Sequence, residues 1–160
     1  MTTFTPPPFV ERFQYKNCVQ VNDPVTRKRV YRTPDGESLP SVTTILGATK
    51  DQTHLNEWRK RIGYEKAQQI TTEAAGVGTA MHSNLERFIA GIQRQPGNNP
   101  VHVQANKMAD VIIKNGLSKV SEVWAMEQSL YFPGLFSGTT DLVAVHDGEP
   151  AVCDYKQTNK

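Results

Sequence analysis

The hydrophobic period changes near Val120, and this change most limits the folds open to the chain. Before it, apolar residues recur at helical spacing over about 54–72, 79–94 and 101–115, with a break expected at Gly76-Val77-Gly78-Thr79. After it, residues 122–132, 138–145 and 151–155 resemble strands. Pro133-Gly134 and Asp147-Gly148 mark the turns between them, and Asp-Gly is a strong hairpin signal. The pattern predicts an α+β fold in which helices precede a mixed meander of strands.

The first 37 residues differ from the rest of the chain. Pro6 to Pro8 indicate an extended arm, and residues 13–21 and 29–33 are strand-like, with a turn at Pro34-Asp35-Gly36. A short helix should begin after Pro40, with Ser41 as its N-cap. We therefore expect an arm and β-hairpin region over 1–37 and a core over 38–160, within a length of 160 residues that suits one domain.

Charge and cysteine content exclude several classes of protein. Six basic and two acidic residues lie between 11 and 32, whereas five basic and seven acidic residues follow position 100. This gradient suits a protein that binds a polyanion, although an ordinary mixed surface is the alternative. No apolar run could span a membrane and no signal peptide opens the chain, so we expect a soluble, intracellular protein. Two cysteines are too few for a disulfide framework or a four-cysteine metal site.

The residues with chemical potential gather on the last strands and one helix. Asp154 and Lys156 are two apart and should share a strand face, near Asp141 on the preceding strand. His82 and Glu86 share a helical face at i, i+4 spacing. Carboxylates can hold a hard divalent cation, and a lysine beside it can orient a bound water for phosphodiester hydrolysis. The alternatives are a surface ion pair and a structural histidine.

Read in order, these pieces resemble a known family. They are residues 39–46 (LPSVTTIL), 78–86 (GTAMHSNLE), Trp124 with Glu127 and Leu130, 138–143 (GTTDLV) and 154–158 (DYKQT). The set looks like the RecB-type branch of the PD-(D/E)xK nucleases, closest to the mitochondrial genome maintenance exonuclease group and its phage relatives. The resemblance implies a restriction-endonuclease-like α/β core and a metal-dependent exonuclease acting on single-stranded DNA, in the host cytoplasm if phage-encoded.

The resemblance also implies a role for each matching residue. His82, Asp141, Asp154 and the Tyr155 carbonyl match ligands of Mg²⁺ or Mn²⁺, Lys156 matches the catalytic lysine, and Glu86 and Glu127 match supporting acids. Ser41, Thr43 and Thr44 match a segment that contacts the DNA backbone. Arg59 and Lys60 are further candidates for phosphate contacts, with a solvated helix face as the alternative.

The function and the completeness of the fold are not decided by these motifs. A structure-specific endonuclease of the same superfamily and a non-catalytic nucleic-acid-binding module remain alternatives to the exonuclease. In the family, a further helix and further strands follow the strand that carries the lysine, whereas this chain ends four residues after Lys156. We therefore expect that a further polypeptide segment completes the fold and that the 160 residues alone cleave DNA weakly or not at all.

Overall fold

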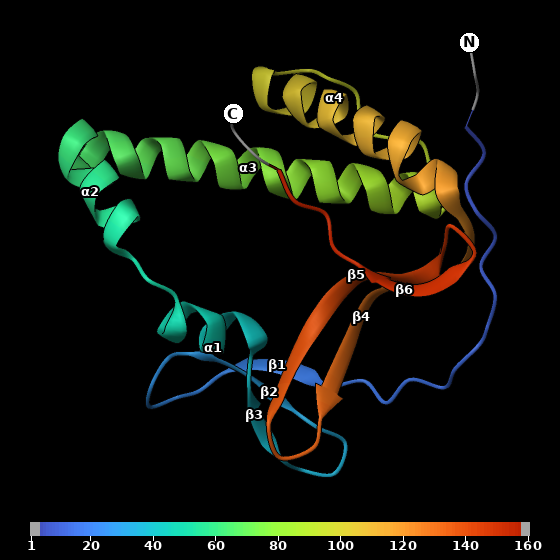
Figure 1. Ribbon diagram of the computed structural model, residues 1–160, viewed down its shortest axis with the longest axis horizontal. Coiled ribbons are helices and arrows are strands. Elements are labelled where there is room, and N and C mark those ends of the chain that lie inside the picture. The colour runs from blue at the N-terminus through green and yellow to red at the C-terminus, as the bar shows by residue number, and fades with distance from the viewer. Residues whose placement is uncertain (1–3, 158–160) are drawn as a thin grey trace.

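The computed structural model describes residues 4–157, and within them the chain forms a mixed α+β fold of four α-helices and two three-stranded antiparallel sheets (Figure 1). The first sheet and a short helix precede the long helices in the sequence, and the second sheet follows them. In chain order the elements are β1 (Val19–Asn22), β2 (Arg29–Arg32), β3 (Ser38–Pro40), α1 (Val42–Thr49), α2 (Thr53–Ile62), α3 (Tyr64–Ile89), α4 (Pro100–Asn115), a 3-10 turn (Leu117–Lys119), β4 (Val120–Phe132), β5 (Phe136–His146) and β6 (Glu149–Cys153).

The predicted strands after Val120 are confirmed as β4, β5 and β6, joined in that order. Asp147 and Gly148 both have positive φ, 48° and 85°, which is the geometry of a type I′ hairpin turn. The expectation of a mixed meander is wrong, because both ladders of this sheet are antiparallel. Within the described residues, parallel pairing occurs only as isolated bridges, Phe9 with Val123 and Ser41 with Ser137.

The predicted helix break lies in the wrong place. The chain turns between α2 and α3 at Gly63, whose φ of 90° favours glycine. Gly76 and Gly78 lie inside the 26-residue helix α3 instead. A Cβ on Gly78 would meet the Gln157 side chain at 3.4 Å, and that side chain donates to the Ala74 carbonyl. The glycine therefore lets the end of the chain lie against the helix.

Helices α3 and α4 lie side by side and cover one end of the second sheet (Figure 1). Gly76 of α3 faces Val101 of α4, and further along both helices the Asn84 side chain donates to that of Asn106. The two helices therefore run in the same direction. The buried Asn84 side chain also accepts from the Gln95 backbone, which holds the returning loop. No helix in the described part of the chain is long and apolar enough to cross a membrane. The core combines Met81, Leu85 and Ile89 with Ala105, Ala109 and Ile113, and with Val123, Leu142 and Ala144 of the sheet.

The N-terminal arm is extended, as predicted, and it pairs with β4. Val10 donates to the Val123 carbonyl, and Val123 donates to that of Pro8. The first sheet has the order β1-β2-β3 and continues past residue 37 into β3. It contacts the second sheet through Tyr31, whose hydroxyl lies 3.2 Å from that of Thr139. These contacts bring α1 beside β5.

Candidate metal centre and adjoining cleft

Three residues distant in sequence converge where α3 crosses the second sheet. His82 comes from α3, Glu127 from β4 and Asp141 from β5. One ligand atom from each lies within 4.8 Å of the others. Ligands on opposite sides of one ion are about 4.2 Å apart for bonds of about 2.1 Å. Two carboxylates and an imidazole nitrogen form a donor set that fits Mn²⁺ after a small contraction, whereas Mg²⁺ favours oxygen donors alone.

Both nitrogens of the His82 ring are in contact with the last strands. Nε2 lies 3.1 Å from the Tyr155 carbonyl, which can only accept, so Nε2 carries a proton in this contact. In the neutral ring, Nδ1 then directs a lone pair at Asp141 Oδ1, 3.3 Å away. A lone pair and a carboxylate repel each other unless a proton or a cation lies between them. Metal-binding histidines use this arrangement, with the second nitrogen held by a carbonyl.

Glu127 reaches the site through an irregularity in β4. Its φ is 49°, a left-handed conformation that is uncommon for residues other than glycine. The ladder pairs Met126 with Leu142 and Gln128 with Thr140, so Glu127 lies opposite Asp141 without a regular strand pairing. Such a conformation costs about 1–3 kcal/mol and is concentrated at functional sites. The backbone here places the carboxylate against Asp141.

The segment after β6 holds the site from the other side. The backbone N–H of Tyr155 donates to Asp141 Oδ2 at 2.6 Å, and the Tyr155 ring lies edge-on to His82 with centroids 5.6 Å apart. Asp154 and Lys156 lie together as an ion pair at 2.8 Å, but the predicted strand face is wrong, because β6 ends at Cys153 before both residues. Their side chains are 52% and 77% exposed, and Asp154 is not part of the three-residue group. The structure thus joins His82 and Asp141 with Glu127, and places Asp154 with Lys156.

Desolvation, reinforced by neighbouring carboxylates, raises the pKa of two acids of the site, Glu86 and Glu127. Partial burial raises the pKa of Glu86, and Asp141 adds to the rise while His82 opposes it. Glu127 is exposed, but partial desolvation still raises its pKa, reinforced by the charges of Glu86 and Asp141. Glu86 and Glu127 line one hollow with His82 and Asp141, together with Gly78, Thr79 and Ser83. The concentration of negative charge in this hollow favours a cation.

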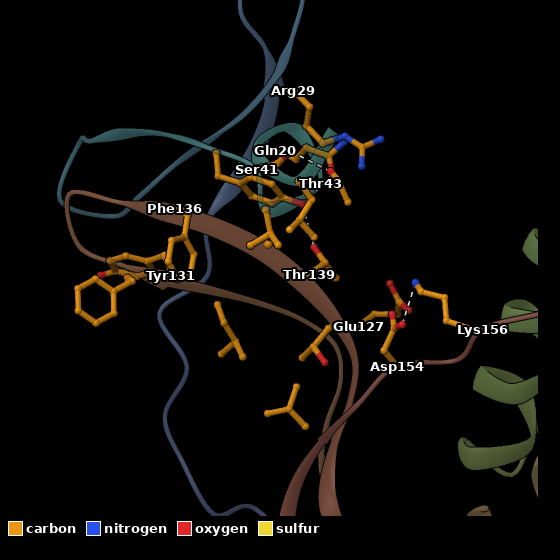
Figure 2. A pocket seen from close by; sticks show the side chains of 18 residues that line it. Gln20, Arg29, Ser41, Thr43, Glu127, Tyr131, Phe136, Thr139, Asp154 and Lys156 are labelled. Atoms are coloured by element: carbon orange, nitrogen blue, oxygen red, sulfur yellow. Dashed lines mark hydrogen bonds and ion pairs between the residues drawn. The ribbon is translucent and has the colours of Figure 1, made fainter. Parts of the chain in front are cut away.

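A larger cleft of about 770 Å³ adjoins this hollow and shares Glu127 with it. It extends from Asp154 and Lys156 past Thr139 to Phe136 at the end of the β4–β5 hairpin, with Arg29 and Thr43 along one wall (Figure 2). A polymer bound in the cleft would therefore pass directly beside the candidate metal centre.

The structure places some of the predicted DNA-contacting residues in the cleft and others away from it. Ser41 is confirmed as the N-cap of α1, where its buried hydroxyl accepts from the Thr44 backbone. Ser41 and Thr43 line the cleft, and Thr43 is exposed there. Arg59 and Lys60 belong to α2, and Arg59 lines a separate hollow with Tyr64 and Glu65. The structure does not bring this basic cluster to the cleft, so its role in phosphate binding stays a prediction.

Several lining residues were missed by sequence reasoning. Arg29 and Thr139 reach the cleft only through the packing of the first sheet on the second, which no local pattern shows. Phe132 and Phe136 could have been found, because residues equally distant from a hairpin turn face each other.

Comparison with known proteins identifies no relative, since neither a family model nor a curated protein matches the chain. An assignment of function therefore depends on the residues and geometry described above.

Proposed function

We propose that the chain is a metal-dependent deoxyribonuclease with a RecB-like PD-(D/E)xK core, which hydrolyses single-stranded DNA from a free end. The observation that carries the proposal is the convergence of His82, Glu127 and Asp141 next to a cleft that Glu127 and Lys156 both line. The order of the motifs along the chain supports the same function, because each matches the position expected from the resemblance.

The roles proposed for the residues follow from their positions. His82, Asp141 and Glu127 would hold Mn²⁺ or Mg²⁺, with Asp154 as a further ligand. A bound ion of this kind polarises a phosphate and lowers the pKa of a bound water. The Lys156 side chain is 77% exposed and lines the cleft, so it can approach a phosphate there, where its charge would offset that of the transition state. Tyr155 positions both His82 and Asp141 through its backbone.

One observation favours the alternative of a nucleic-acid-binding module without catalysis. Lys156 is paired with Asp154, and both are outside the three-residue group. In a nuclease, substrate or metal would have to draw Asp154 towards Asp141. A binding module has no such requirement.

Cleavage and metal binding together test the nuclease proposal. The full chain should bind Mn²⁺ in a calorimetric titration and should slowly shorten an end-labelled single strand during long incubation. We expect Lys156→Ala to lower cleavage at least 100-fold, because the charge facing the transition state is lost. Mn²⁺ binding should change little in this variant, and Asp141→Asn should abolish both activities.

The matched control is Lys107→Ala, which removes a lysine from the exposed part of α4. Its cleavage should equal that of the unaltered chain. Cleavage retained by Asp141→Asn, or the absence of both Mn²⁺ binding and cleavage, would contradict the proposal. Cleavage of circular single strands, which have no free end, would show that the activity is that of an endonuclease and not of an exonuclease. Because these 160 residues are expected to cleave weakly or not at all, strand binding without cleavage would favour the binding module only if Asp141→Asn binds the strand as well as the unaltered chain does.

A further inference from the structure

Two phenylalanines at the end of the β4–β5 hairpin are exposed although they form a pair. Phe132 and Phe136 face each other across the turn, with ring centroids 6.0 Å apart. They are 56% and 40% exposed, and Leu135 in the turn is 57% exposed. Scattered apolar side chains are ordinary on a surface, but a paired aromatic cluster at the end of a cleft suggests a ligand.

The cleft that contains the two rings is continuous with the candidate metal centre. Its lining proceeds from Phe132 and Phe136 through Gly138 and Thr140 to Asp154 and Lys156. Gly138 lies under the first residue of α1, since a Cβ there would meet Val42 Cγ2 at 3.3 Å. The start of α1 therefore packs directly on β5, where both line the cleft between the two rings and Asp154.

The wall on the α1 side carries polar and positively charged groups beside the apolar Val42 and Leu46. Arg29 and Thr43 are exposed, and Figure 2 shows them on the same side of the cleft, apart from Phe136. No carboxylate of residues 4–157 lies within ion-pair distance of Arg29. A guanidinium and a hydroxyl are natural partners of phosphate. One wall thus suits a sugar–phosphate backbone, and the opposite end suits the faces of bases.

We propose that this cleft binds a single-stranded nucleic acid, with bases stacked on Phe132 and Phe136 and the backbone along Arg29 and Thr43. The inference rests on the proposed function and adds how the substrate is held. Aromatic rings accept the face of any base, so binding is tolerant of sequence. Bases in a duplex are already stacked on each other, so the aromatic pair selects unpaired strands. The rings therefore account for a preference that the metal ligands alone do not create.

Binding of a labelled strand without cleavage tests the proposal. We would measure the fluorescence anisotropy of a 20-nucleotide oligothymidylate in Ca²⁺, with the full chain and with Phe132→Leu/Phe136→Leu. Leucine keeps apolar bulk at the hairpin end but removes the aromatic face. Loss of base stacking should raise the dissociation constant roughly 5-fold to 100-fold, about the range for one stacked base. Tyr64→Ala, which removes another exposed aromatic residue, should change affinity less than twofold.

A strand of the same length without bases separates stacking from simple apolar contact. On this abasic strand the double leucine variant and the unaltered chain should bind equally. Thermal unfolding of each variant would verify that the hairpin is intact. Arg29→Gln is a second test, because it leaves the β4–β5 hairpin unaltered and should weaken the binding of both the normal and the abasic strand.

Three results would overturn the inference. They are equal affinity of the leucine variant for oligothymidylate, an equal loss on the abasic strand, and tight binding of a protein instead of any strand. These results are distinct from failure of the proposed function. A chain that cleaves DNA with Mn²⁺ but binds strands without the two rings refutes only the stacking, whereas a chain that binds through the rings but neither binds Mn²⁺ nor cleaves refutes only the nuclease.

Discussion

The carboxyl group of Glu86 shows how closely the acids of the site are packed. Glu86 lies one helical turn after His82 on α3, in the same hollow as Glu127 and Asp141. Burial and the charge of Asp141 raise its pKa above the ordinary value of 4.5. A carboxyl whose pKa is higher in the folded chain than in the unfolded chain favours folding most when it is protonated. That contribution is complete below the unfolded pKa and is lost as the pH rises through the folded pKa.

Removal of this charge should therefore stabilise the metal-free protein at neutral pH. We expect Glu86→Gln to raise the melting temperature at pH 7 by about 2 °C, and to have almost no effect at pH 4 and below. Glu73→Gln, on an exposed part of the same helix, is the matched control and should change little at either pH. Thermal unfolding in the presence of a chelator measures the difference. A gain for Glu86→Gln that is larger in acid would reverse the sign and contradict the electrostatic explanation.

At the scale of elements, the position of α1 depends on one glycine of β5. A Cβ on Gly138 would lie 3.3 Å from Val42 Cγ2, closer than most side chains tolerate. Alanine would also restrict the unfolded chain, which by itself stabilises by about 0.4–1 kcal/mol. Since the helix start must shift slightly to admit the methyl group, the close contact should outweigh this gain.

The two effects can be separated by a double-mutant cycle between Gly138 and Val42. Gly138→Ala should lower the free energy of unfolding by about 0.5–1 kcal/mol in the natural background. With Val42→Ala present the same change should be neutral or stabilising, because the atom it meets is gone. Urea denaturation of the four chains gives the coupling. An identical effect in both backgrounds would mean that α1 does not restrict Gly138.

The elements themselves were largely predictable, because local patterns determine them. Strand-like segments and the Asp147-Gly148 turn located β5 and β6, and Ser41 located the start of α1. The helix break was misplaced because glycine has two different uses. Gly63 adopts a positive φ that a local turn requires, whereas Gly78 makes room for Gln157, a contact made by a residue 79 positions later. Only the folded chain distinguishes these uses.

For the whole molecule, the sequence predicted which residues belong to the candidate site better than it predicted which of them lie together. His82, Glu127 and Asp141 each carried a signal in the sequence, and all three meet. The positive φ of Glu127 and the pairing of Asp154 with Lys156 depend on the register of β4 and on the path of the chain after β6. The position of Arg59 depends on how α2 turns at Gly63. These are consequences of tertiary packing, which residue spacing does not encode.

A metal that joins α3, β4 and β5 should stabilise the entire fold, because the unfolded chain cannot offer the three ligands together. At 100 times its dissociation constant, such an ion contributes about 2.7 kcal/mol, which raises the melting temperature by about 5–10 °C. We expect this shift with Mn²⁺ for the full chain, and its loss in Asp141→Asn.

Asp154→Asn decides between the two ligand sets, and Glu149→Gln is its control on the exposed edge strand β6. If the group of His82, Glu127 and Asp141 binds the ion as it stands, Asp154→Asn should keep most of the Mn²⁺ shift. If the ligand set implied by the resemblance is right, the shift should fall as far as in Asp141→Asn. In that case Asp154 must leave Lys156 to reach the ion, which would release the lysine charge next to a bound phosphate. The melting temperatures with and without Mn²⁺ therefore also show whether metal binding prepares Lys156 for catalysis.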